Sequence, residues 1–180
     1  MASPSDLSHL TLAVSLAREA LHAGDAPFGS VLVSRTGAVL QTDRNRTVTG
    51  SPSASPSDPS VDGRPDATLH PEFTLARWAQ LNLTAEERAS TTVYTSGEHC
   101  AMCAAAHAYC GLGAIVYASS TAQYGRWMEE YGVPAGKLRP LAIGEVAPGL
   151  EVRGPVGGLE DEVKALHVER WTRLGYAKKG

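Results

Sequence analysis

Apolar residues along the chain alternate between helical and strand-like spacing, and this alternation constrains the fold more than any other feature. They recur at helical intervals between Ser5, a candidate cap, and Gly24, where a helix would stop. Two apolar runs around a glycine-containing turn, 28–33 and 38–41, predict a hairpin. Further strands are expected over 91–96 and 114–119, with helices over 70–80, 99–110, 121–131 and 159–174. Strands that alternate with helices predict an α/β layered fold, in which helices cover a sheet.

The length of the chain favours one domain. A chain of 180 residues can bury a core without disulfides or metals as braces, so we expect a single domain over 1–180. Residues 50–66 are rich in Ser, Pro, Asp and Gly and cannot bury an apolar face, which predicts a mobile loop. A helical segment from about residue 159 would complete the domain.

Charge and cysteine content narrow the compartment and the partners. An odd number of cysteines and a start without a basic or an apolar signal region predict a reducing, cytoplasmic setting. No apolar run approaches the roughly 20 residues of a membrane helix, so no membrane association is expected. The formal charge is -3 and the chain has no basic block, which argues against binding a nucleic acid.

All three cysteines and two histidines fall within residues 95–113, "TSGEHCAMCAAAHAYCGLG". The spacing of Cys100 and Cys103 places two sulfurs one turn apart on the same face at a helix start, where they can share a metal ion. Unpaired N–H groups at a helix start also favour thiolates. Two alternatives stay open for this pair, namely small buried core residues and a thioredoxin-like redox motif.

A second motif shifts the balance toward metal chemistry. In "LHPEFTLARWA", residues 69–79, His70 and Glu72 are two apart at the start of a helix, and Pro71 suits its first turn. Zinc catalysis requires soft thiolates and an imidazole as ligands, one open position for water, and a carboxylate that moves protons without ligating. The two motifs together contain this set.

"HPE" at 70–72 followed by "EHCAMC" at 98–103 resembles the zinc-dependent cytidine deaminase-like superfamily, whose pattern is H-x-E…P-C-x-x-C. "APFGSVLV" at 26–33 resembles the first hairpin of the branch that contains guanine, cytosine and tRNA-adenosine deaminases. "RNR" at 44–46 occupies the place of a substrate-contacting Asn in that branch. The resemblance covers about residues 6–130 and implies a three-layer α/β/α fold with a central mixed sheet of about five strands.

The resemblance also implies roles for residues. His70, Cys100 and Cys103 would hold one Zn²⁺ per chain, with water as the fourth ligand, and Glu72 would transfer protons as the catalytic residue. The reaction would replace an amino group on a heteroaromatic carbon by a carbonyl and release ammonia, without an organic cofactor.

Substrate contacts are implied for Asn45, Phe28 and Pro71. Relatives often use a backbone N–H at the position of Pro71 to hold a substrate carbonyl, and proline has no N–H. Either substrate orientation would rest more on Asn45, or the substrate would lack that carbonyl. His99 replaces the usual proline before the first cysteine. It could be a fourth ligand that closes the site, although adjacent residues such as His99 and Cys100 rarely reach one ion without strain.

Other histidines and aromatic residues are first interpreted as structural. His107 lies four residues after Cys103 and could share its helix face, and we expect either a buried polar contact or plain core packing there in preference to metal ligation. Trp127, Trp171 and Tyr176 could cap a base-binding pocket, but aromatics at helical spacing more often belong to a core.

Three functional classes remain. The first is a deaminase of a free nucleobase or related ring, guanine-like before cytosine-like bases, triazines or nucleosides. The second is a tRNA adenosine deaminase, which would need a basic surface, and the third is a non-catalytic module stabilised by zinc. A homodimer is expected from the resemblance and from the small residues of "CAAAHAYCGLG", which could pack closely against a partner.

Overall fold

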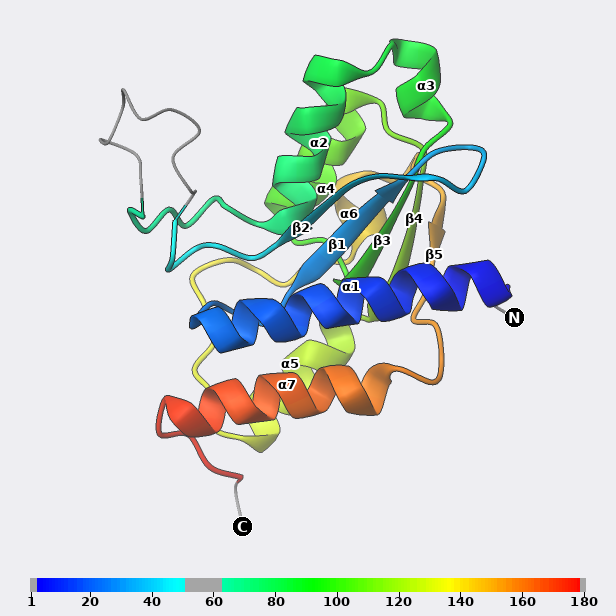
Figure 1. Ribbon diagram of the computed structural model, residues 1–180. Helices are drawn as coiled ribbons and strands as arrows, with labels where there is room; N and C mark the ends of the chain where they lie inside the picture. Colours follow the sequence, from blue (N-terminus) through cyan, green and yellow to red (C-terminus); the bar gives the residue numbers. More distant parts are fainter. Residues whose placement is uncertain (1–2, 51–62, 179–180) are drawn as a thin grey trace.

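The computed structural model describes residues 3–50 and 63–178, and the helices in these ranges flank a five-stranded sheet (Figure 1). Most of the loop predicted over 50–66 falls on residues 51–62, which lie outside the described residues. No helix within the described ranges is long and apolar enough to cross a membrane.

The sheet is mixed, and its strands lie in the order β2-β1-β3-β4-β5. β1 runs antiparallel to both β2 and β3, whereas β3, β4 and β5 are parallel. The strand bounds are β1 Gly29–Val33, β2 Val39–Arg44, β3 Thr92–Gly97, β4 Ala114–Ser119 and β5 Val152–Arg153. The predicted hairpin and the two later strands are confirmed. β5 was not predicted, because two residues carry no periodic signal.

The helices are α1 Pro4–Ala23, α2 Pro71–Asn82, α3 Ala85–Ala89, α4 Ala101–Cys110, α5 Thr121–Glu130, α6 Ile143–Val146 and α7 Glu160–Arg173. The predicted cap of the first helix was wrong. Ser3 is its N-cap, because Ser3 and Asp6 exchange side-chain and backbone hydrogen bonds in a capping box, and Pro4 occupies the first turn. α3 and α6 were not predicted, since each is little more than one turn.

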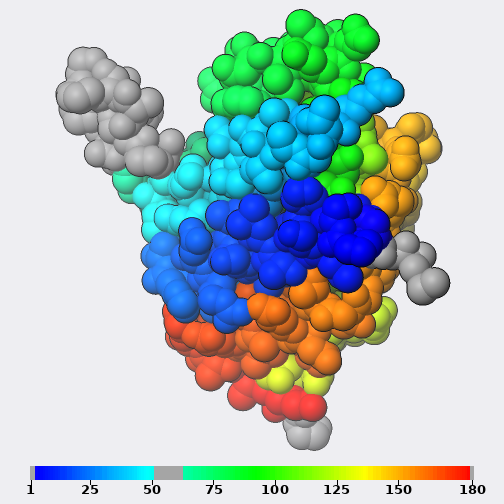
Figure 2. All heavy atoms as spheres, turned by 45° about the vertical axis from the view of Figure 1, so that its right-hand side comes forward, coloured from blue at the N-terminus to red at the C-terminus, as the bar shows by residue number. Residues whose placement is uncertain are grey.

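Two helical layers cover the sheet. α2, α4 and α6 pack on one face against Leu32, Val93 and Ile115, while α1, α5 and α7 cover Val31 and Val116 on the other. Alternating strand residues thus enter two cores, as the pleat requires. α1 and α7 lie side by side on the outer surface (Figures 1 and 2). The α/β/α architecture predicted from the sequence is confirmed.

The parallel strands set the position of the functional site. Gly97 and Ser119 are register partners at the carboxyl ends of β3 and β4, so the segments leading into α4 and α5 leave the sheet at the same edge. In α/β sheets, ligands bind outside the carboxyl ends of such strands. α2 belongs to the same layer as α4 and packs against it, which brings the start of α2 to this edge.

Candidate active site

The two predicted motifs meet at the starts of α2 and α4. His70 is the N-cap residue of α2, Cys100 is the N-cap of α4, and Cys103 lies in the first turn of α4. The ligand atoms of these residues all lie within 4.8 Å of one another, and they form a cluster that could hold a metal ion. The loop between β3 and α4 and the loop before α2 therefore converge on one point.

The spacing within the cluster fits zinc. Two sulfurs bound tetrahedrally at about 2.3 Å from the ion lie about 3.8 Å apart, and a sulfur and an imidazole nitrogen about 3.6 Å apart. The Sγ atoms of Cys100 and Cys103 are 3.6 Å apart, and Cys100 Sγ is 3.7 Å from His70 Nδ1. The cysteines are free, so the sulfurs can ligate.

Glu72 lies beside the cluster without belonging to it. Its carboxylate is buried, with Oε2 at 3.6 Å from Cys103 Sγ and Oε1 at 2.9 Å from the Thr95 hydroxyl. Burial raises the pKa of Glu72 above its ordinary value, because the charged form loses hydration. General acid–base groups work best when their pKa lies near the working pH, and burial shifts the pKa of Glu72 in that direction.

The charge of the cluster is distributed unevenly. Hydrogen bonding with Cys103, and then with His70, lowers the pKa of Cys100 to about 4, so this sulfur is a thiolate at neutral pH. The same hydrogen bond with Cys100 is the main reason why the pKa of Cys103 is raised. Hydrogen bonding with Cys100 also raises the pKa of His70. A metal ion at this place would displace the protons of Cys103 and His70, because thiolate sulfurs and a neutral imidazole are the ligating forms.

A cavity of about 550 Å³ reaches the cluster, because His70 and Cys100 are among the residues that line it. Phe28 and Tyr124 contribute aromatic walls. Gly97 makes room for one of them, because an added Cβ would lie 2.8 Å from Phe28 Cε1. The volume lies in the range that suits a small organic ligand.

Glu98 lines this cavity and binds two neighbouring segments of its wall. Its two carboxylate oxygens accept hydrogen bonds from the backbone N–H groups of Thr121 and Ile143, at 2.8 and 3.0 Å. These groups begin α5 and α6, so one side chain holds both segments in place. The charge also suits the positive end of a helix.

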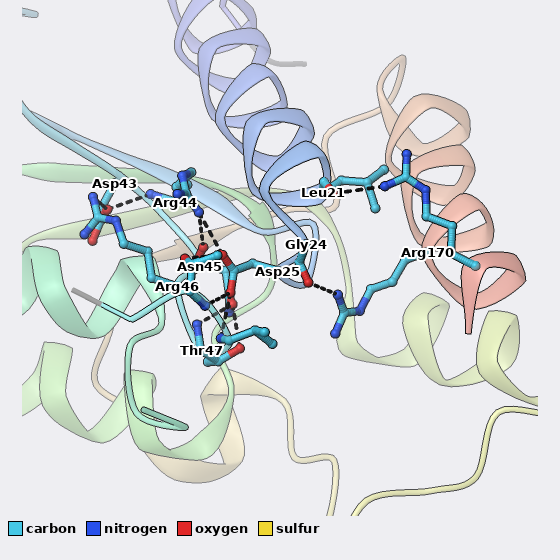
Figure 3. A network of polar contacts seen from close by, with 12 residues as sticks. Leu21, Gly24, Asp25, Asp43, Arg44, Asn45, Arg46, Thr47 and Arg170 are labelled. Carbon is cyan, nitrogen blue, oxygen red and sulfur yellow. Dashed lines mark hydrogen bonds and ion pairs between the residues drawn. The ribbon is translucent and has the colours of Figure 1, made fainter. Parts of the chain in front are cut away.

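The three predicted substrate contacts differ in position. Phe28 lines the cavity, whereas Asn45 and Pro71 are buried and are not among its lining residues. Asn45 is nevertheless held next to Phe28, since its backbone N–H donates to the Phe28 carbonyl at 2.9 Å. Its side-chain Oδ1 accepts from the N–H and hydroxyl of Thr47, as Figure 3 shows in part. The substrate roles of these residues stay predictions.

A buried ionic network supports the turn that carries Asn45 (Figure 3). Asp25 is fully buried, and its carboxylate accepts from the Arg44 guanidinium, from the N–H groups of Val48 and Thr49, and from the Thr49 hydroxyl. Burial alone would raise the pKa of Asp25, but the hydrogen bonds hold it below its ordinary value. Sequence reasoning missed Asp25, although an acidic residue directly after a helix-ending glycine was a visible signal.

The histidines that could have competed for the metal lie elsewhere. His99 is buried, neither ring nitrogen has a hydrogen-bond partner within the described residues, and the ring packs edge-on against His107 at 5.4 Å. His107 Nε2 lies 2.9 Å from the Gly113 carbonyl, which is the buried polar contact expected for it. Neither belongs to the cluster, so the described donors number three and leave a fourth position open.

The candidate pocket aromatics of the C-terminal half are core residues. Trp127 and Trp171 are buried between α1, α5 and α7, and Tyr176 packs against that core. Tyr124 reaches the cavity instead, and sequence reasoning missed it. The buried His167 ring contacts both cavity walls, with centroids 4.9 Å from Phe28 and 4.8 Å from Tyr124, so α7 supports the pocket from behind.

Comparisons with known proteins agree with this geometry. The chain is 26% identical over 175 residues to a probable cytosine deaminase of Schizosaccharomyces pombe, and the alignment covers 94% of each protein. Its fold is similar to that of a guanine deaminase from Nitrosomonas europaea, with a TM-score of 0.65 and 22% identity, over 94% of this chain and 85% of that one. A tRNA deaminase studied for A-to-I editing matches with a TM-score of 0.53 and 23% identity, over 88% of this chain and 97% of that one.

A family model decides the assignment. The model described as the cytidine and deoxycytidylate deaminase zinc-binding region matches residues 3–119, which is more than half of the chain and includes both motifs. The chain therefore belongs to the cytidine and deoxycytidylate deaminase zinc-binding family and is a hydrolytic deaminase that acts on a C–N bond.

Proposed function

We propose that this protein is a zinc-dependent aminohydrolase of a free nucleobase or a related amino-bearing ring, with guanine-like purines as the first choice. The observation that carries the proposal is the cluster of His70, Cys100 and Cys103 with the Glu72 carboxylate beside it. Three donors leave one position for water, which separates a catalytic site from a closed structural one. Each chain would hold one Zn²⁺.

His70, Cys100 and Cys103 would hold the zinc ion, which when bound would make hydroxide available at neutral pH by lowering the pKa of water from about 15.7 toward 7. Glu72 would accept one proton of the attacking water at Oε2 and deliver it to a ring nitrogen. It would then carry the second proton, which the new C–OH group releases as the carbonyl forms, to the departing amine. Phe28 and Tyr124 hold the planar ring from the cavity wall. Ammonia leaves, and a carbonyl replaces the amino group.

The size and the aromatic walls of the cavity favour a bicyclic base as the substrate. Its volume of about 550 Å³ exceeds what a single small ring fills, and its aromatic walls suit a purine face. Charged lining residues also argue against a nucleic acid, because Glu98 and Glu129 outnumber Arg139. A base flipped out of tRNA would need cationic side chains around the mouth to hold neighbouring phosphates.

Cytosine is the second candidate substrate, favoured by the alignment with the probable cytosine deaminase along nearly the whole of both chains. Triazines and nucleosides follow, and tRNA is third.

A homodimer also stays a proposal. The outward side of α4 carries Ala105, Ala108 and Tyr109, and Tyr109 is 91% exposed, so a second copy could cover this side. Sedimentation at working concentration tests the proposal, and a monomer would reject it.

Ammonia release from guanine, cytosine, their nucleosides, an aminotriazine and a tRNA anticodon stem, measured on zinc-analysed protein, tests the substrate class. We expect guanine to have the highest kcat/KM and the metal content to be one zinc per chain. Activity on the RNA alone would reject the free-base proposal, and activity without zinc would reject the mechanism.

Gly125 offers a sharper test of the bicyclic fit. It lines the cavity and has open space for a side chain, so Gly125→Leu should narrow the cavity and raise KM for guanine more than for cytosine. Gly144→Leu is the matched control, because Gly144 also has open space but lies on α6 outside the cavity lining. An equal change in KM for both bases would contradict the purine preference.

A further inference from the structure

Thr95 ties the buried end of Glu72 to the sheet. Thr95 lies in β3 and is fully buried, and its hydroxyl donates to Glu72 Oε1 at 2.9 Å. Thr95 Oγ1 in turn accepts a hydrogen bond from the hydroxyl of Ser30 in β1, also at 2.9 Å. Ser30 and Thr95 are register partners in the antiparallel pairing of the two strands. Two strands and a helix are therefore linked by a chain of three side chains.

The hydroxyl of Thr95 has one proton and several acceptors within reach. Besides Glu72 Oε1, the Gly97 carbonyl lies at 3.0 Å and the Gly29 carbonyl at 3.4 Å. A carboxylate oxygen is the strongest acceptor of the three, because a hydrogen bond to a charged group is about twice as strong as a neutral one. The Ser30 hydroxyl donates to Thr95 Oγ1 and so occupies one of the lone pairs of this oxygen. The hydroxyl proton of Thr95 itself is then donated to Glu72 Oε1.

The two oxygens of Glu72 consequently have different surroundings. Oε1 is held by Thr95 on the side of the sheet, and Oε2 is 3.6 Å from Cys103 Sγ on the side of the donor cluster. A carboxylate held at one oxygen cannot turn freely about its last bond. The hydrogen bond therefore keeps Oε2 facing the place where protons are transferred.

We propose that Thr95 is a positioning residue that orients the Glu72 carboxylate, with Ser30 holding the Thr95 hydroxyl in turn. The proposal rests on the proposed function for its kinetic consequences. Thr95 is not among the residues that line the cavity, so its loss should leave substrate binding almost unchanged and slow the proton transfers. A displacement of about 1 Å in a reacting group can cost about a hundredfold in rate.

Three variants test the proposal. Thr95→Val removes the hydroxyl at nearly constant volume and should lower kcat roughly tenfold to a hundredfold, with KM changed less than about twofold. Thr95→Ser restores the hydroxyl and should recover most of kcat. Ser30→Ala should lower kcat less than Thr95→Val does, since the bond to Glu72 remains. All variants should keep one zinc per chain.

Thr91→Val is the matched control. Thr91 is also buried, and its hydroxyl donates to the Arg88 carbonyl at 2.7 Å. It lies directly before the first residue of β3, whereas the donor cluster lies beyond the last residue of that strand. We expect kcat of Thr91→Val to stay near that of the unmodified protein. An equal fall in kcat for both valine variants, or no recovery with Thr95→Ser, would overturn the positioning role.

A stability measurement separates this proposal from the proposed function. Unfolding free energies of Thr95→Val, Glu72→Gln and the double variant form a cycle that needs no substrate. Contact between the two side chains predicts a coupling energy clearly above error, and Thr91→Val with Glu72→Gln predicts none. A cycle without coupling would overturn the link even in an active enzyme. Coupling in a chain that deaminates no base would reject the proposed function alone.

Discussion

The two helices that carry the candidate metal ligands, α2 and α4, start differently from α1, α3 and α5. α1, α3 and α5 begin with complete capping boxes, in which an N-cap hydroxyl and the side chain three residues later satisfy backbone N–H groups. α2 and α4 begin at His70 and Cys100, and neither makes a side-chain cap. Cys100 and Cys103 have the spacing of the capping-box pair, but their sulfurs face each other and His70.

The uncapped starts of α2 and α4 lower helix stability but favour ligand placement and the thiolate form of Cys100. A missing cap costs about 1 kcal/mol of helix stability. In return, the unsatisfied N–H groups of α4 present partial positive charge to the thiolate of Cys100. The same sequence spacing thus serves helix stability in α1, α3 and α5 and ligand placement in α4.

The largest expected effect comes from Glu72, in the first turn of the uncapped α2. Glu72→Gln should lower turnover by about 10²–10⁴, because general acid–base transfer is lost, while zinc content and fold persist. Turnover and elemental analysis check this outcome. Loss of zinc would identify Glu72 as a ligand, and full turnover would favour a structural zinc.

Cys100→Ser would convert the start of α4 into one that resembles α5. Zinc affinity should fall by at least about a hundredfold, since changes in outer-shell partners alone cost up to that much. The metal-free variant should be as stable as the metal-free parent, or more stable by up to about 1 kcal/mol, because serine caps well. Zinc titration and denaturant unfolding measure both effects. Unchanged zinc affinity would exclude Cys100 from the ligand set.

Two imidazoles, the half-buried His70 and the buried His167, extend the comparison to the dependence on pH. Hydrogen bonding with Cys100 raises the pKa of His70, whereas burial among the aromatic rings behind the pocket lowers the pKa of His167 to about 3. His167 therefore binds a proton below about pH 6.5 in the unfolded chain, but only below about pH 3 in the folded chain. Stability should fall with decreasing pH in this window, by up to about 1.4 kcal/mol per unit from His167.

His167→Phe removes this contribution and should flatten the dependence of unfolding free energy on pH between about 6.5 and 3. His22→Gln, which replaces an exposed histidine of α1, is the control for removing an imidazole. If the unfolding free energies of His167→Phe and the parent change equally with pH, His167 is not held neutral by burial.

The smallest effect is expected at a capped start. Ser120→Ala removes the hydroxyl that accepts from the Gln123 N–H, and it should cost about 1 kcal/mol of unfolding free energy without changing zinc affinity. Thermal unfolding and zinc titration measure the two quantities. A change in zinc affinity as large as that of Cys100→Ser would erase the distinction between the two kinds of helix start.

The sequence by itself determined the local parts of the site. His70 with Glu72, and Cys100 with Cys103, each lie within one helical turn, so their relative positions follow from helix geometry once a helix starts there. The alternating apolar segments likewise determined the layers and four of the five strands. Short-range geometry of this kind depends on neighbours in the chain.

Tertiary structure alone decided the rest. Thr95 meets Glu72 through the pairing of β3 with β1 and the packing of α2 on the sheet, and no spacing in the sequence encodes that contact. Tyr124 lines the cavity while Trp127, three residues later on the same helix, enters the core, and helical spacing alone does not separate these two neighbouring positions. Such choices depend on contacts between segments far apart in the chain, and only the folded protein makes them.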